Sequence, residues 1–423
     1  MRSMVEGALP LRRRLAIDTR PPRRSSTTCS PQRGESWIGV AAVTSVYLDY
    51  NATAPIRPEA AEAAACALAI GGNPSSIHAA GRLARAAVEK AREQVASLVG
   101  VKPGSLTFTS GGAEANNLAI ESAILAGAKR PLIGLTEHAS VLASAMASGL
   151  MVEGWPVTAD GRADLDWLRD RLSKWSAKDG APFAALSLVN NETGVIQPVA
   201  EAAELIHAAG GWLHVDAVQA AGKIPVDFAA TGADTLALSG HKLGGPQGVG
   251  ALAAGPRATL SRRIHGGGQE RGRRAGTENL SGIAGFGAAA EAALSDLPYA
   301  AAQAAWRDAA QARVLDAADV EVFGAQSPRV SGTLCFGCDG FDAERQVMAL
   351  DLDGVMVSAG AACSSGKMAP SAVLIAMGFE PLANQSIRAS GGWATTEDDW
   401  DRFAEAWLAA YTRHQARRRA SAA

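Results

Sequence analysis

The sequence predicts an α/β protein, with a large domain built on a mostly parallel sheet and a smaller α+β domain. Short, almost uninterrupted apolar runs alternate with helical patterns over the first two thirds of the chain, which is typical of parallel strands buried on both faces. Beyond residue 297 a long Ala-rich helical pattern is followed by shorter strand-like runs. A chain of 423 residues also exceeds the size at which one hydrophobic core stops growing, so we expect two domains.

The predicted elements follow one another in a regular order. A short strand is expected at 46–50, and apolar residues at helical spacing predict helices at 58–70 and 79–99. Six strand-like runs then alternate with helical patterns, at 105–109, 131–136, 183–189, 211–215, 234–238 and 248–253. The smaller domain is expected to hold a helix at 299–316, strands at 328–336, 355–358 and 386–390, and closing helices at 396–414.

These elements divide the chain into a tail, a large domain at 61–297, and a small domain made of 45–60 and 298–423. Residues 1–44 are rich in Arg, Ser and Pro and lack a steady apolar period, so we expect a disordered tail. Its eight arginines and three acidic residues give it a net charge of +5, which leaves −7 on the rest of the chain. An acidic body gives no electrostatic reason to expect nucleic-acid binding. The tail is either an organelle transit peptide or a translated upstream stretch without a role.

Five cysteines, an odd number, do not indicate a disulfide framework; they are Cys29, Cys66, Cys335, Cys338 and Cys363. We therefore expect a reducing, cytoplasmic location, with an organelle matrix as the alternative if the tail is a transit peptide. No apolar stretch of about 20 residues predicts a membrane span. Cys335 and Cys338 have no second pair to complete a zinc set, so we interpret them as structural and expect no metal site. Cys66 is expected to face a helix core.

Glycines and polar side chains follow five of the predicted strands. In open parallel sheets, ligands bind outside the carboxyl ends of the strands. The sequence therefore predicts a ligand site at one edge of the sheet. The residues that follow the strands are a Gly-rich turn at 110–113, His138, Asn190 with Asn191, Asp216 and Lys242.

Three of these features have a structural and a chemical interpretation. The turn at 110–113 is either a plain turn or an anion site at the start of a helix. Asp216 is either a helix N-cap or a buried carboxylate that keeps a pyridine nitrogen protonated. Lys242 at a buried strand end is informative because lysine is nearly always solvated, and a desolvated amine can form a Schiff base.

The stretches 214–219 (HVDAVQ) and 239–242 (SGHK) resemble motifs of pyridoxal-phosphate (PLP) enzymes of fold type I, in the class V aminotransferase group. Within that group the similarity is to cysteine desulfurases of the iron–sulfur assembly type. The resemblance covers roughly 46–412. Further matching stretches are 48–55, 72–76, 108–111, 136–138, 189–194, 265–272, 274–277 and 386–388.

The resemblance implies how the cofactor ring is held. Lys242 would bind PLP as a Schiff base, and Asp216 would pair with the pyridine nitrogen. His138 would stack on the ring and assist proton transfers. Gln219 and Asn191 would bond near the phenolic oxygen, Asn191 rather than its neighbour Asn190, and Asn191 would also reach the substrate.

The resemblance also implies a phosphate site. Backbone N–H groups of Gly112 and Ala113 and the side chains of Ser239 and His241 would contact the phosphate. Thr277 would reach the phosphate of a partner subunit, which implies a homodimer. Many relatives have Thr where Ala113 stands, so one hydroxyl contact is missing here, at a cost of about 1 kcal/mol.

Arg388 and Cys363 would act on the substrate. A planar guanidinium such as that of Arg388 suits a substrate carboxylate. Cys363 lies in a stretch of small residues and glycines at 358–367 with little apolar content, which disfavours a small buried hydrophobe and favours a reactive thiol. The resemblance implies that the Cys363 thiolate attacks the substrate sulfur, with Cys363, Lys242 and His138 as the catalytic residues.

The predicted function is therefore that of a PLP-dependent cysteine desulfurase. It would convert L-cysteine to L-alanine, form a persulfide on Cys363, and pass the sulfur to an iron–sulfur scaffold or a tRNA-thiolation carrier. One alternative is an aminotransferase, C–S lyase or selenocysteine lyase of the same group without persulfide transfer. Another is a weakly catalytic scaffold in a sulfur-assembly complex.

Overall fold

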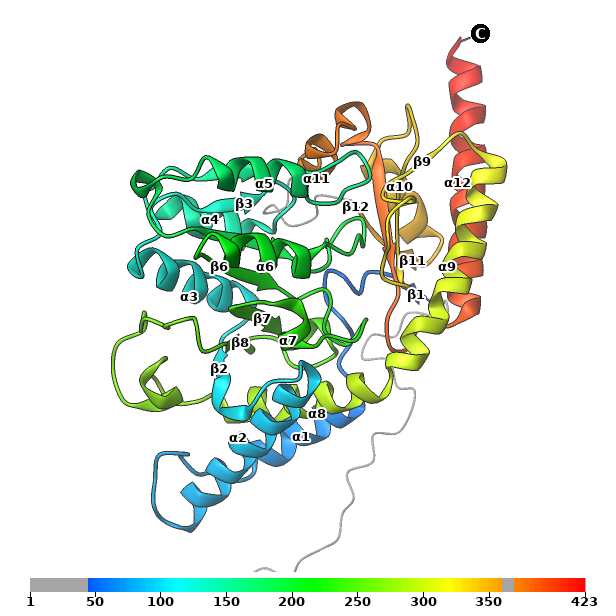
Figure 1. Ribbon diagram of the computed structural model, residues 1–423. Helices are drawn as coiled ribbons and strands as arrows, with labels where there is room; N and C mark the ends of the chain where they lie inside the picture. Colours follow the sequence, from blue (N-terminus) through cyan, green and yellow to red (C-terminus); the bar gives the residue numbers. More distant parts are fainter. Residues whose placement is uncertain (1–44, 360–368, 423) are drawn as a thin grey trace, which may run out of the picture. The chain divides into compact units, whose positions relative to one another are not determined.

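A sheet of seven strands forms the larger part of the protein, whose computed structural model describes residues 45–359 and 369–422 (Figure 1). The strand order is β2-β8-β7-β6-β5-β3-β4. β8 is antiparallel to both of its neighbours, and the other pairings are parallel, as expected for a mostly parallel sheet. The strands are β2 (Leu106–Thr109), β3 (Leu132–Gly134), β4 (Glu153–Trp155), β5 (Phe183–Ser187), β6 (Trp212–Asp216), β7 (Thr235–Ser239) and β8 (Gly250–Ala254).

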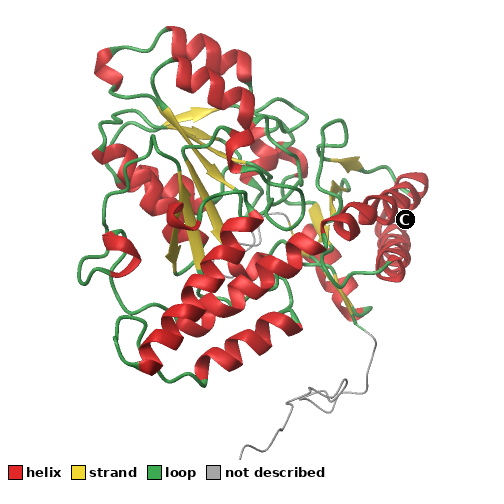
Figure 2. Cartoon of the chain, turned by 60° about the horizontal axis from the view of Figure 1, so that its bottom comes forward, coloured by secondary structure: helices red, strands yellow, loops and turns green. Residues whose placement is uncertain are grey.

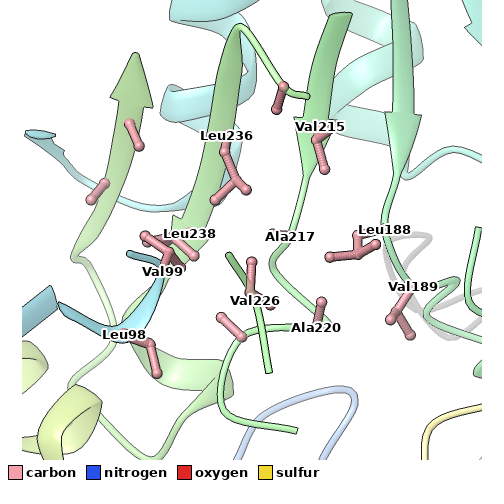
Figure 3. Close-up of a cluster of buried hydrophobic side chains, with 14 of the residues drawn as sticks. Leu98, Val99, Leu188, Val189, Val215, Ala217, Ala220, Val226, Leu236 and Leu238 are labelled. Carbon is pink, nitrogen blue, oxygen red and sulfur yellow. The ribbon is translucent and has the colours of Figure 1, made fainter. Parts of the chain in front are cut away.

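Helices cover both faces of this sheet, which explains why its strands are almost continuously apolar. Figure 2 shows the strands between layers of helices. On β7, Leu236 and Leu238 belong to the cluster that includes residues of α2, α6 and α8, and this cluster is drawn in part in Figure 3. Ala237, between them, packs with Ala115 and Leu118 of α3 on the opposite face.

The helices associated with the large sheet end in short, tight connections. Three of them, α1, α2 and α8, pack against one another below the sheet in Figure 1. The helices are α1 (Pro58–Leu68), α2 (Ala79–Leu98), α3 (Gly112–Leu125), α4 (Ala139–Ala147), α5 (Leu165–Ser173), α6 (Val199–Ala208), α7 (Phe228–Thr231) and α8 (Leu280–Ser295).

A second, four-stranded antiparallel sheet has the order β12-β13-β10-β9. Beside it β1 (Val46–Tyr47) pairs in parallel with β11 (Val355–Met356). Trp400, Phe403 and Trp407 of the last helix pack against Phe336 of β10 in one buried cluster. These elements are α9 (Leu297–Ala317), β9 (Glu321–Val322), β10 (Thr333–Gly337), α10 (Ala343–Leu352), β12 (Ser358–Ala359), α11 (Ala372–Ala376), β13 (Ser386–Ser390) and α12 (Glu397–Ala422).

The structure differs from the sequence-based prediction mainly in short elements. β4 and β9 were not predicted, since two or three residues are too few to show a periodic pattern. The first strand has two residues instead of five, because Asp49 forms only an isolated bridge with Ser390 of β13 and the chain turns at 50–52. The predicted tail at 1–44 and Cys363 lie outside the described residues. Over the described ranges, none of the helices has the length and apolar character needed to cross a bilayer.

A buried ion pair joins α2 to the segment after β8. Arg92 and Glu270 form two hydrogen bonds of 2.8 Å, with side chains only 5% and 3% exposed. Glu270 Oε2 also accepts a bond of 2.9 Å from the Phe108 N–H on β2. The pair therefore fixes three parts of the chain, and neither charge is solvated.

We expect Arg92→Met to lower the free energy of unfolding by about 3–5 kcal/mol, because it leaves the Glu270 carboxylate buried without its cation. Chemical denaturation of both proteins measures the change. Lys90→Met, an exposed position on the same helix, is the control and should change the free energy by less than about 0.5 kcal/mol. Equal effects of the two substitutions would contradict this account.

Candidate active site

A cavity of about 600 Å³ lies at the edge of the large sheet where the parallel strands end. Its lining comes from the residues that follow β2, β5, β6 and β7, and from the segment after β1. Ten of the residues predicted from the sequence line this one cavity: Gly112, Ala113, His138, Asn191, Asp216, Gln219, Ser239, His241, Lys242 and Arg388.

Lys242 ends the short 3₁₀ turn Gly240–Lys242 that follows β7. Its Nζ donates hydrogen bonds to the carbonyl oxygens of Asn51 at 2.6 Å and Ala52 at 2.7 Å. The two carbonyls hold the amine at the cavity wall, at the sheet edge where the sequence predicted a Schiff-base lysine.

Asp216 is the last residue of β6 and is 6% exposed. Asn116 donates to its Oδ2 at 2.7 Å, and the Val218 N–H donates to its Oδ1 at 2.9 Å. Among the described residues no salt bridge reaches this carboxylate. A buried carboxylate is stable when a cation or hydrogen-bond donors face it, so a protonated pyridine nitrogen fits the open side of Asp216.

Asn116 is held by a buried histidine that the sequence did not single out. His214 Nε2 lies 3.0 Å from Asn116 Oδ1, and His214 Nδ1 lies 2.9 Å from Thr235 Oγ1. Burial lowers the pKa of His214 to about 4, so the ring is neutral at pH 7. Because Asn116 Oδ1 accepts, His214 carries its proton on Nε2 and accepts from Thr235 at Nδ1.

His138 is the N-cap of α4. Its Nδ1 accepts from the Ser140 N–H at 3.1 Å and lies 2.8 Å from Ser140 Oγ. Asn116 Nδ2 donates to the same Ser140 Oγ at 2.9 Å. His138 and Asp216 are therefore linked through Asn116 and Ser140.

The start of α3 offers backbone donors to an anion. Gly111 is the N-cap, and no side chain caps this helix end, so the first N–H groups are available to a ligand. A Cβ at Gly112 would lie 2.8 Å from Val218 Cγ2, which explains why this position is glycine. Ser239 is buried beside it, and a phosphate fits these donors. Burial and the positive charge of Lys242 lower the pKa of His241 to about 4.

Arg388 lies on β13 and is 2% exposed. It donates to the Asn191 carbonyl oxygen at 3.0 Å and to Asp49 Oδ1 at 2.8 Å. Its buried Nε has no hydrogen-bond partner among the described residues. Arg388 lines the cavity, and a guanidinium suits an amino-acid carboxylate.

The two neighbouring asparagines take different places. The side chain of Asn190 is used inside its own turn, where its Oδ1 accepts from the Glu192 and Thr193 N–H groups at 2.9 Å. Asn191 lines the cavity. The expectation that Asn191 is the member of the pair at the site is therefore consistent with the geometry.

The structure does not place two of the predicted residues in this cavity. Thr277 is exposed and does not line it, and Cys363 lies outside the described residues. Cys335 and Cys338 are buried, and burial raises the pKa of both thiols, which agrees with a structural role. Cys66 is exposed, so the expectation that it faces a helix core was wrong. Over the ranges that the structure describes, no cluster of ligating side chains could hold a metal.

Four residues of the site were missed by sequence reasoning: Asn51, Asn116, Ser140 and Lys223. Asn51 lies in the turn after the first predicted strand, and Asn116 lies in the helix after the Gly-rich turn at 110–113. Lys223 follows Gln219 by four residues, and its Nζ donates to Gln219 Oε1 at 2.5 Å. The spacing alone gives no sign that this lysine is turned inward.

With the geometry in place, comparison with known proteins decides the family. A family model described as aminotransferase class-V matches residues 46–403. The chain belongs to this family. This confirms the group to which the motifs pointed.

Several relatives are named cysteine desulfurases. One from Cereibacter sphaeroides is 42% identical over 369 residues, covering 85% of this chain and 94% of the relative. An IscS-like cysteine desulfurase from Mycobacterium tuberculosis is 38% identical and covers 89% and 98%. The X-ray structure of a NifS-like protein from Rickettsia africae has a TM-score of 0.79 at 31% identity, covering 87% and 99%. A structure of SspA in complex with cysteine has a TM-score of 0.69 at 27% identity, covering 82% and 98%. These similarities confirm the predicted fold class and the resemblance to cysteine desulfurases.

We expect Asn116→Leu to weaken PLP binding by about 10- to 100-fold, because Asp216 loses a donor to its charged oxygen. Titrating the PLP-free protein with PLP and following its absorbance gives the dissociation constants. Asn117→Leu is the matched control, since the Asn117 side chain bonds only to the Ala113 carbonyl of its own helix among the contacts described. Equal dissociation constants for the two variants would rule out this role of Asn116.

Glu137 gives a pH-dependent prediction. Its carboxyl group accepts from the Ser187 N–H at 2.6 Å and from Ser187 Oγ at 2.7 Å, while burial and the charge of Asp216 raise its pKa from 4.5 to about 7. Between these two pH values the folded chain keeps a proton that the unfolded chain releases. The free energy of unfolding therefore falls as pH rises through this window.

Glu137→Gln stays neutral at every pH and should escape this loss. Its stability relative to the unsubstituted protein should rise by about 3 kcal/mol between pH 4.5 and pH 8, measured by urea denaturation. Glu62→Gln, at an exposed position on α1, should follow the unsubstituted protein throughout. Parallel profiles for Glu137→Gln and the unsubstituted protein would show that Glu137 is ionised across the whole range.

Proposed function

We propose that this chain is a PLP-dependent cysteine desulfurase that releases L-alanine from L-cysteine and leaves a persulfide on Cys363. One observation carries the proposal: Lys242, Asp216 and Arg388 line the same cavity. They supply an amine for an aldehyde cofactor, a carboxylate for its ring nitrogen and a guanidinium for an amino-acid carboxylate. The names of the relatives and the cysteine bound to SspA support the same substrate.

PLP, when bound, supplies an aldehyde that condenses with amines and a ring that accepts the electrons left by the broken bond. The chain supplies the rest. Lys242 offers the amine and, once free, a base next to the substrate carbon. Asp216 keeps its charge opposite the ring nitrogen because Asn116 and the Val218 N–H donate to it. His138 lines the same cavity, where Ser140 binds its Nδ1 and orients the ring for proton transfer.

Arg388 orients the substrate. Asp49 and the Asn191 carbonyl accept from two of its nitrogens, which holds the guanidinium in one orientation at the cavity wall. A fixed carboxylate places the side chain of the amino acid in a defined direction. This is what transfer of the substrate sulfur to a protein thiol requires.

The described residues on both sides of the segment that carries Cys363 are anchored at the site. Ser358 pairs with Arg388 across β12 and β13. Ser371, at the start of α11, donates to Glu192 Oε2 at 2.6 Å, in the turn that also carries Asn191. This anchoring supports Cys363 as the sulfur-accepting thiol.

The finer parts of the proposal concern partners and organisation. The sulfur acceptor is an iron–sulfur scaffold or a thiolation carrier, and the location is cytoplasmic unless the tail at 1–44 is a transit peptide. The protein is a homodimer in which Thr277 reaches the phosphate of the partner subunit; its exposure, away from its own cavity, supports this. The chain divides into domains at 61–297 and at 45–60 with 298–423.

We expect the unsubstituted protein, supplied with PLP, L-cysteine and a thiol reductant, to release alanine and sulfide in equal amounts. Cys363→Ala should lose sulfide release by at least about 10³-fold, since it lacks the attacking thiol, while its PLP absorbance is retained. Cys66→Ala, which removes an exposed cysteine, is the matched control and should keep full turnover. Full sulfide release by Cys363→Ala would favour a C–S lyase, and conversion of cysteine to its keto acid with the sulfur retained would favour an aminotransferase.

A further inference from the structure

A second lysine lies against the site without lining its cavity. Lys223 Nζ donates to Asn51 Oδ1 at 2.6 Å and to Gln219 Oε1 at 2.5 Å. Asn51 and Gln219 both line the 600 Å³ cavity, whereas Lys223 lines a neighbouring one of about 40 Å³. Lys242 borders both cavities. The two lysines therefore lie close together, and both amines bind Asn51.

Lys223 determines how two amide groups face. A protonated amine has donors only, so the oxygens of Gln219 and Asn51 must point to it and their nitrogens away from it. Gln219 Nε2 donates one hydrogen to the Asn51 carbonyl at 2.9 Å and keeps a second. Asn51 Nδ2 donates to the Asn191 carbonyl at 3.0 Å and to Thr333 Oγ1 at 3.1 Å. With Lys223 in place, Gln219 presents an N–H, not a carbonyl oxygen, on the cavity side.

Lys223 also adds positive charge where two other cations already lie. Burial and the positive charges of Lys242 and Arg388 hold the pKa of Lys223 well below its usual range. The repulsion between two charges is mutual, so a proton on Lys223 disfavours a proton at position 242 to the same extent. Asn51 connects the pair directly, with its side chain bound to Lys223 and its carbonyl to Lys242.

We propose that Lys223 is a positioning residue for the cofactor: it turns the Gln219 amide so that an N–H faces the phenolic oxygen of PLP, and when protonated it disfavours a proton on the nitrogen of Lys242. The role rests on the proposed PLP chemistry. If the role of Lys223 were purely structural, its replacement would change the free energy of unfolding and nothing else. A positioning role instead changes the proton affinity of the linkage between Lys242 and the cofactor, which the absorbance of the bound PLP reports.

The test uses the full chain loaded with PLP, with the absorbance of the Lys242-bound cofactor followed against pH. Lys223→Met should raise the titration midpoint by about one pH unit, because it removes a like charge from beside the titrating nitrogen. Lys223→Arg keeps the charge and the donors and should stay near the midpoint of the unsubstituted protein. Lys178→Met, at an exposed position, should leave the midpoint unchanged.

An unchanged midpoint in Lys223→Met would overturn the proposal, as would equal shifts in the Met and Arg variants. If Lys223→Met does not fold, Lys223→Gln decides instead, since it loses the charge but keeps a donor; the same upward shift supports the proposal and no shift overturns it. Failure of the unsubstituted protein to bind PLP would overturn the proposed function itself. If PLP binds but the midpoint of its absorbance titration does not change on substitution of Lys223, only the proposed role of Lys223 is overturned.

Discussion

Two main-chain carbonyls, those of Asn51 and Ala52, accept the amine of Lys242, and this contact brings the segment after β1 onto the edge of the large sheet. The same segment reaches the smaller sheet, where the Asn51 N–H donates to Ser390 Oγ at 3.0 Å and Asp49 pairs with Arg388. Residues from both sheets therefore meet around Asn51. The amine of Lys242 and the guanidinium of Arg388 keep their relative positions because one short segment binds them both.

The cavity has a positively charged side and a negatively charged side, and the charges of PLP and a bound amino acid are complementary to them. Lys242 and Arg388 form a positive side with the donors of α3, and the described part of the chain places Asp49 as the ion-pair partner of Arg388. Asp216 faces the cavity from β6, with Glu137 nearby. His214 and His241, whose pKa values are lowered to about 4, are neutral at pH 7, so they shape hydrogen bonds without adding charge. The positive side suits three anionic groups, namely the phosphate, the phenolic oxygen and the substrate carboxylate. The side with Asp216 suits a pyridinium.

The sequence predicted the residues of the site better than the contacts among them. His138, Asp216 and Lys242 each follow a strand directly, and the parallel pairing of β3, β5, β6 and β7 brings those strand ends together. The links through Asn116 could not be predicted, because His214, Ser140 and Asp216 converge on it from 24 to 100 positions away in the chain. Cys66 was misplaced for a related reason. In an Ala-rich helix the apolar stripe is weak, so the buried face is set by α8 packing against α1 and not by a visible pattern.

Lys223 shows why the local sequence pattern does not reveal every residue of the site. A lysine four residues after Gln219 reads as an ordinary solvated side chain, yet the fold turns its amine inward to two amide oxygens. Enclosing it beside two other cations costs free energy, which a sequence selected only for stability would avoid. Within the described ranges, Arg388 Nε has no hydrogen-bond partner and the Asp216 carboxylate has donors but no salt bridge, which is unfavourable in the same sense. Each of these groups faces or supports the same cavity, and an anionic cofactor with a protonated ring would relieve all three.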